Sequence, residues 1–172
     1  MIQLRCTQKL LKEIGITKSD FCNICQSDSI LGNWYANIFI IDRRKAIAFV
    51  NERTFLSFLI YGISKRNIKG IKELFINGLS QLLSLEGFTA TDIENNIKGC
   101  AEIQYTITNS KTILGNVNDI VNLYKHFILS DGGLKSCNLS EIIAQINRTP
   151  QRNLNWANSI ETVKEIITMK TA

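Results

Sequence analysis

The sequence is poor in the features that membrane proteins and secreted proteins need. It contains one proline and one histidine among 172 residues, and its five cysteines are an odd number. No apolar run approaches the roughly 18 residues of a membrane-spanning helix, and the densest run, residues 55–60, has the length of a strand. The first five residues lack the basic and long apolar regions of a secretory signal. We therefore expect a cytoplasmic protein with no membrane partner.

The scarcity of histidine and the spacing of cysteine argue against two common kinds of site. A Cys-His or Ser-His nucleophile would have to use His126, which falls beside the apolar stripe of an expected helix and is best interpreted as a surface residue. Cys22 and Cys25 have the C-x-x-C spacing, but no second pair follows and they lie in a loop rich in serine and aspartate. We predict no metal and no cofactor, and we expect free thiols.

Charge of one sign is only in modest excess. Twenty basic residues against 15 acidic ones give a net charge of +5. The abundance of isoleucine, asparagine and lysine is typical of an AT-rich genome, so the excess alone is weak evidence for a polyanionic partner. The basic residues form only two clusters along the chain, Arg43-Arg44-Lys45 and Lys65-Arg66.

Apolar residues are plentiful and periodic. They make up 45% of the chain, enough for a single domain spanning residues 1–172 with one core. Two apolar runs, residues 35–41 and 46–50, flank a polar connection from Asp42 to Lys45 and predict a hairpin. Both runs are apolar on both faces, which places the hairpin at the centre of a covered sheet.

The remaining pattern completes an α+β fold. A turn at residues 51–54 leads into a third strand over residues 55–61, which predicts an antiparallel meander. Further strands are expected over residues 1–5 and 101–108. Thr7 can cap a short helix through about Ile14, and five further helices are expected over residues 67–85, 91–98, 113–129, 138–146 and 159–169. We predict an antiparallel sheet built on the central hairpin and packed with about five helices.

Several sequence blocks resemble an uncharacterised prokaryotic family, a domain of unknown function. Its relatives are sometimes linked to plasmid or transposon passenger genes, and the resemblance implies no activity. The blocks are L-R-C-T at residues 4–7, L-G-N-W-Y-A-N at 31–37, D-R-R-K at 42–45, N-E-R-T at 51–54, L-G-N-V-N-D at 114–119 and I-N-R-T-P at 146–150. Asn33 stands where the family usually has aspartate, which weakens any role for a carboxylate there.

The polar members of these blocks supply the first group of candidate ligand-binding residues. Asn37 interrupts an apolar strand, where a buried amide needs hydrogen-bond partners. Asn118 and Asp119 are expected near the start of a helix, where an anion could dock or where Asp119 could simply complement the helix dipole. A site on these residues would combine Asn37 and Asn118 with Asp119 and a basic residue such as Arg5.

The second group of candidates is the basic end of the expected hairpin. Arg43, Arg44 and Lys45 at a β-ribbon tip could hold phosphates or enter a groove, and the alternative is a solvated polar turn. The turn at residues 51–54 lies at the opposite end of the strand, so the two turns cannot form one compact site.

Three functions from different classes remain open. The first is a small binding module for nucleic acid or a protein partner, in mobile-element or phage–host biology, which the basic hairpin favours. The second is an enzyme acting on a nucleotide or another phosphate-bearing substrate at Asn37, Asn118 and Asp119. The third is a structural or oligomerising protein that uses Trp34 and Trp156 as exposed aromatics.

Overall fold

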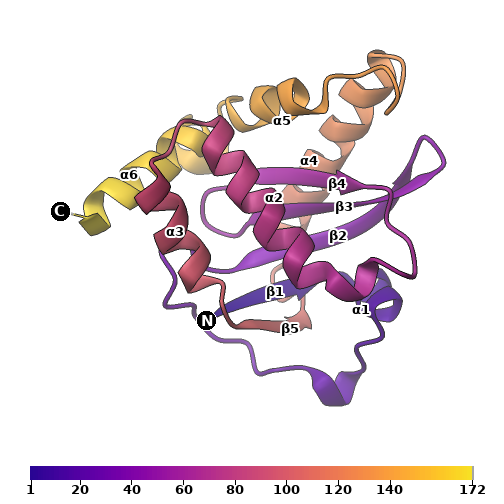
Figure 1. The fold of residues 1–172 in the computed structure, drawn as a ribbon, viewed down its shortest axis with the longest axis horizontal. Coiled ribbons are helices and arrows are strands. Elements are labelled where there is room, and N and C mark those ends of the chain that lie inside the picture. The colour runs from indigo at the N-terminus through magenta and orange to yellow at the C-terminus, as the bar shows by residue number, and fades with distance from the viewer. Residues whose placement is uncertain (172) are drawn as a thin grey trace.

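A five-stranded mixed sheet forms the centre of the protein (Figure 1). The structure is a computed structural model and describes residues 1–171. The strand order is β4-β3-β2-β1-β5. The strands are β1 (Ile2–Cys6), β2 (Trp34–Ile41), β3 (Arg44–Asn51), β4 (Ser57–Tyr61) and β5 (Ile103–Ile107).

The meander predicted from the apolar runs is confirmed. β2 pairs antiparallel with β3, and β3 pairs antiparallel with β4. β2 and β3 lie inside the sheet, and their side chains are buried on both faces except at the half-buried Asn37 and near the hairpin end. The uninterrupted apolar pattern of these strands therefore reflects cover on two sides.

The expectation of a wholly antiparallel sheet is wrong for two of the five strands. β1 lies between β2 and β5 and pairs with both in parallel. The relative direction of two neighbouring strands depends on the connection between them, and here a helix and a long loop carry the chain from β1 to β2. Apolar alternation is the same in either direction, so the sequence pattern could not distinguish the two.

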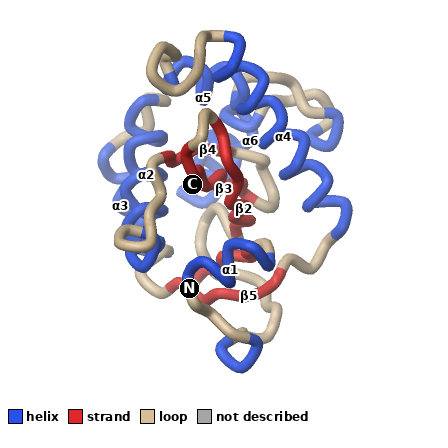
Figure 2. The backbone as a smooth tube through the Cα atoms, turned by 90° about the vertical axis from the view of Figure 1, so that its right-hand side faces the viewer, coloured by secondary structure: helices blue, strands red, loops and turns tan. Residues whose placement is uncertain are grey.

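Helices cover both faces of the sheet, as Figure 2 shows with α2 and α3 on one side and α4 on the other. One core contains residues from α1, α2, α3 and α6, and the opposite core contains residues from α4 and α5. The helix bounds are α1 (Gln8–Ile14), α2 (Ile71–Leu85), α3 (Ala90–Gly99), α4 (Lys111–Ser130), α5 (Leu139–Asn147) and α6 (Ser159–Thr171). The α+β class is confirmed.

Four aromatic rings pack together under α2. The ring centroids of Trp34 and Phe75 are 5.2 Å apart, and those of Phe49 and Phe58 are 5.0 Å apart. Trp34 has no exposed surface, so the hypothesis that it contributes to an interface is wrong. Gly78 permits this packing, because a Cβ there would lie 2.4 Å from the ring of Phe58.

None of the helices within residues 1–171 combines the length and the apolar character that crossing a membrane requires.

Candidate functional site

The hairpin that carries Arg43, Arg44 and Lys45 is tighter than the sequence suggests. Only Asp42 and Arg43 form the turn, with φ angles of 46° and 61°, and β3 begins at Arg44. Positive φ at both central residues is the geometry of a two-residue type I′ hairpin turn, which fits the twist of the strands. The expected four-residue connection is therefore wrong. Type I′ turns usually contain glycine, and residues 42–45 contain none, so the sequence did not indicate this turn.

This turn separates the three basic side chains that the sequence grouped together. Neighbouring residues of a strand point to opposite faces, so Arg44 and Lys45 point away from each other. Lys45 lies on the α1 side, where its Nζ is 2.7 Å from Oε1 of Glu13. The three residues do not form a single grip at the hairpin tip.

Lys45 instead joins lysines from distant parts of the chain. Lys9 and Lys12 lie on α1, and Lys65 and Lys69 lie between β4 and α2. A surface hollow is lined by Lys9, Lys12, Glu13, Lys65 and Lys69. We call these five lysines, Lys9, Lys12, Lys45, Lys65 and Lys69, the basic cluster. The face on which α1 lies is turned toward the viewer in Figure 2.

The pKa of Glu13 is affected by several lysines of the basic cluster. Its pKa is lowered from 4.5, first by the hydrogen bond from Lys45 and then by the charges of Lys45, Lys65 and Lys9, while partial desolvation acts in the opposite direction. Lysines from three separate segments thus act on one carboxylate. The sequence signal for this cluster was the Lys65-Arg66 pair, but nothing in the sequence indicated that it lies beside α1.

Arg5 occupies a different and closed environment. Its side chain is 2% exposed, and Nη1 donates to Oε1 of Glu52 and to Oδ1 of Asn109, the latter at 3.0 Å. Nη2 donates to the carbonyl oxygen of Cys25 at 3.2 Å, and Tyr35 also donates through its hydroxyl to Asn109 Oδ1, at 2.7 Å. Arg5 therefore joins β1 to three loops, with most of its donors already used.

Sequence reasoning did not identify Glu52 and Asn109 as partners of Arg5. Asn109 lies 104 positions from Arg5 in the chain, and Glu52 lies 47 positions away. The turn that carries Glu52 is held by Asn51, whose Oδ1 accepts hydrogen bonds from the main-chain N–H groups of Arg53 and Thr54. The N-E-R-T block thus combines a residue that shapes the turn with a counter-ion for Arg5.

Asn37 and Asn118 meet across the interface between β2 and α4. Nδ2 of Asn37 donates to Oδ1 of Asn118 at 3.2 Å, and the hydroxyl of Thr7 donates to Oδ1 of Asn37 at 3.4 Å. The structure therefore brings these two candidates together, and Asp119 beside them is exposed. Arg5 points elsewhere, toward Glu52 and Asn109.

The expected anion site at the start of this helix is wrong in position. α4 begins at Lys111, and Ser110 caps it by accepting a hydrogen bond from the N–H of Ile113. Asn118 and Asp119 therefore lie in the third turn, where the main-chain N–H groups are already bonded within the helix and the dipole has little effect. Gly115 lies inside the helix.

The C-x-x-C segment covers the sheet beside β1 and β5. The carbonyl oxygens of Cys22 and Cys25 accept hydrogen bonds from Thr106 and from Arg5, respectively. All five cysteines are free. Within residues 1–171 no group of three or more histidine, cysteine, aspartate or glutamate side chains is placed to hold a metal ion. The main chain of this segment, rather than its thiols, makes the contacts.

Comparison with known proteins supplies a family but no activity. None of the curated proteins matches the chain. A family model described as "Domain of unknown function (DUF6933)" matches residues 3–162.

Proposed function

The chain belongs to the DUF6933 family, and from that premise we propose that it is a binding module that holds the phosphate backbone of a nucleic acid on its basic cluster. The family description carries no activity, so the support comes from the residues of this chain. The link to plasmids and transposons that the family resemblance implies for this protein stays a prediction.

The convergence of lysines around Glu13 is the observation that carries the proposal. The basic cluster sets five lysines against a single carboxylate, and it draws them from α1, β3 and the segment before α2. Five of the basic residues that look dispersed along the sequence thus lie together around one carboxylate. Lysines gathered in this way attract phosphates and release their counter-ions.

The residue type indicates how the nucleic acid would be recognised. An ammonium group is a point charge that binds phosphate without the planar fork by which arginine reads guanine. Because Lys45 is held by Glu13, four lysines remain free for phosphates. We therefore expect binding that depends little on base sequence, with a slope of log K against log salt of about −3.6 for double-stranded DNA.

Fluorescence anisotropy with a labelled 20-base-pair duplex of mixed sequence tests the proposal. The test variant carries Lys9→Gln, Lys12→Gln and Lys65→Gln. The control variant carries Lys98→Gln, Lys111→Gln and Lys164→Gln, which removes the same charge from exposed sites on α3, α4 and α6. We expect the test variant to lose at least tenfold in affinity and most of the salt slope, and the control to change little.

Two results of this titration would overturn the proposal. Equal losses in the test and control variants would mean that net charge alone is responsible. Absent or salt-independent binding by the unmodified protein, with the duplex and with a single strand of the same sequence, would exclude nucleic acid as the partner.

A second candidate function, an enzyme acting on a phosphate-bearing substrate, is supported by the contact between Asn37 and Asn118. These residues lie near the carboxyl ends of β1 and β5, parallel neighbours whose connections lead to opposite faces of the sheet. Ligands of open α/β sheets bind at such points. Titration with nucleoside monophosphates, followed by NMR of the side-chain amides of Asn37 and Asn118, tests this candidate, and unchanged amide signals would exclude it.

A further inference from the structure

The outer edge of β4 is an incomplete β-ladder. β4 is a terminal strand of the sheet, and at Ser57 its outward groups are bonded by the side chain of Asn147. Oδ1 of Asn147 accepts from the N–H of Ser57 at 2.8 Å, and Nδ2 donates to the carbonyl oxygen of Ser57 at 2.7 Å. One carboxamide thus makes both hydrogen bonds that a residue of a neighbouring strand would make.

The next outward-facing residues of β4 have no such partner. Because strand residues alternate in direction, the main-chain groups of Leu59 and Tyr61 point to the same side as those of Ser57. Within residues 1–171 no further strand pairs with this edge and no side chain bonds to these groups. Unpaired edge groups of this kind are a template for another strand.

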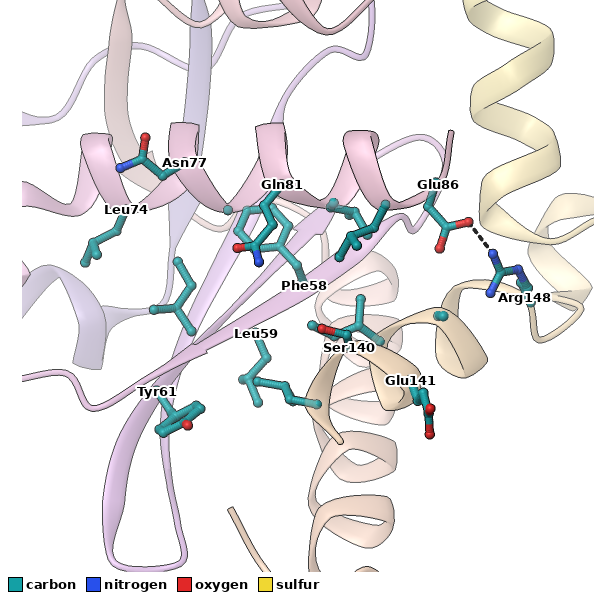
Figure 3. Close-up of a pocket in the computed structure, with 17 residues that line it drawn as sticks. Phe58, Leu59, Tyr61, Leu74, Asn77, Gln81, Glu86, Ser140, Glu141 and Arg148 are labelled. Atoms are coloured by element: carbon teal, nitrogen blue, oxygen red, sulfur yellow. Dashed lines mark hydrogen bonds and ion pairs between the residues drawn. The ribbon is translucent and has the colours of Figure 1, made fainter. Parts of the chain in front are cut away.

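A groove of about 480 Å³ runs along this edge between α2 and α5 (Figure 3). Its lining is largely apolar and includes Leu59, Leu74 and Ile143, with Tyr61 and Leu85 exposed by 39% and 61%. Figure 3 shows Tyr61 toward one end of the groove and Glu86 toward the other. Exposed apolar surface beside unpaired backbone groups matches the two requirements of β-strand addition, which are side-chain pockets and a ladder.

The charges along the groove are complementary to a particular kind of segment. Glu86 is 3% exposed and forms an ion pair with Arg148 at 2.6 Å, so those two charges cancel. Glu141 also lines the groove and has no ion-pair partner among the described residues.

We propose that the groove binds an extended, apolar peptide segment of a partner protein, which adds a strand beside β4 and places a basic residue against Glu141. The main chain of the segment pairs with Leu59 and Tyr61, and its alternate side chains enter the apolar lining. This site is separate from the basic cluster and from any role in binding nucleic acid.

Selection from a phage-displayed library of random decapeptides on the full chain supplies the probe. An enriched peptide is synthesised with a fluorophore, and its affinity is measured by anisotropy. We expect enriched sequences to alternate apolar and polar residues and to contain a terminal lysine or arginine. N-methylation of alternate main-chain nitrogens is expected to weaken binding at least tenfold in one of the two registers.

Matched variants locate the peptide. Gln81→Trp fills the groove from α2, whereas Ser84→Trp adds the same bulk at an exposed site of the same helix outside the groove. Tyr61→Pro removes the outward N–H at an edge position that tolerates proline, and Tyr61→Ala retains that N–H without the ring. We expect at least tenfold losses for Gln81→Trp, and for Tyr61→Pro relative to Tyr61→Ala, with little change for Ser84→Trp.

Circular dichroism establishes that each variant is folded, so the binding results are decisive. Failure to enrich any peptide overturns the proposal, as does an enriched peptide that binds Gln81→Trp normally. Insensitivity to N-methylation in both registers would indicate a helical occupant and contradict strand addition. Light scattering that reveals a dimer abolished by Gln81→Trp would assign the groove to a second copy of the chain instead.

Discussion

Buried polar side chains in this protein either form hydrogen bonds to main-chain groups or form an ion pair. Asn51 and Asn147 replace missing backbone partners, since each has no exposed surface and each bonds to main-chain groups of a neighbouring segment. Arg5 forms an ion pair with Glu52 through Nη1 and donates to a loop carbonyl through Nη2, whereas its buried Nε has no hydrogen-bond partner among the described residues. Removing the carboxylate of Glu52 would therefore leave the guanidinium of Arg5 as an uncompensated charge in the protein interior.

We predict that Glu52→Gln lowers the free energy of unfolding by about 2–4 kcal/mol, because the guanidinium of Arg5 stays buried without its counter-ion. Urea unfolding measures the change. The double variant Arg5→Met and Glu52→Gln should recover part of the loss, since neither charge then remains. Glu94→Gln is the control, because its pair with Lys98 is exposed and worth at most about 1 kcal/mol. A loss for Glu52→Gln no larger than that of the control would contradict the prediction.

At the scale of elements, the β2–β3 hairpin carries strain that its sequence does not reveal. Asp42 and Arg43 both have positive φ, which non-glycine residues adopt at some cost. The side chain of Asp42 is useful there, because its Oδ2 accepts a hydrogen bond from the N–H of Leu134 at 3.1 Å. Within residues 1–171 the side chain of Arg43 makes no comparable hydrogen bond or ion pair, so it can be removed at little loss.

We therefore predict that Arg43→Gly stabilises the protein by about 0.5–1 kcal/mol, because glycine adopts the required φ without strain. Thermal unfolding followed by circular dichroism measures the effect. Arg44→Gly is the matched control, and it should destabilise the protein because Arg44 lies in β3, where glycine weakens a strand. Stabilisation by both substitutions would mean that loss of charge, and not the turn, is responsible.

The contact between Glu13 of α1 and Lys45 of β3 makes the stability of the protein depend on pH. The lysines hold the pKa of Glu13 below its ordinary value of 4.5. A carboxyl whose folded pKa is lowered adds stability above its unfolded pKa, and this contribution is lost as the pH falls through the lowered value. The relevant window is therefore acidic, below about pH 4.5.

We predict that NMR titration of Glu13 gives a pKa below 4.5, and that Lys45→Gln moves this pKa upward by removing the charged hydrogen-bond donor that lowers it most. Addition of an oligonucleotide should also raise it, because bound phosphates offset the charges of the neighbouring lysines. A pKa of Glu13 that does not respond to Lys45→Gln would contradict the assigned cause.

At the scale of the whole molecule, both cores share one sheet. Phe49 faces the core that contains α2, and its neighbour Val50 faces the core that contains α4. Unfolding of either core would therefore expose a face of β3 and remove support from the other.

We predict a single calorimetric transition with equal calorimetric and van't Hoff enthalpies, of about 120 kcal/mol near 60 °C for a chain of this length. This result would support the single domain expected over residues 1–172. Two separated transitions, or a van't Hoff enthalpy well below the calorimetric one, would contradict it.

Local periodicity predicted much of the fold because each pattern depends on neighbours in the chain. Residues 35–41 are apolar on both faces, which indicates a strand covered on two sides, and Asn138 with Glu141 indicates a helix start that the structure confirms. The candidate site was less predictable. Asn37 and Asn118 could be singled out as polar residues in apolar surroundings, but the partners of Arg5 are separated from it by long stretches of chain.

The sequence by itself determined the α+β class, the central meander and the burial of β2 and β3, because side-chain patterning within a few residues fixes them. Only the tertiary structure decided that β1 and β5 run parallel, that Arg43, Arg44 and Lys45 point apart, and that Lys45 joins lysines of α1 and the loop before α2. Those outcomes depend on chain direction and on contacts between distant segments. The composition gives the number of charged residues, but only the folded chain shows which of them lie on the same face.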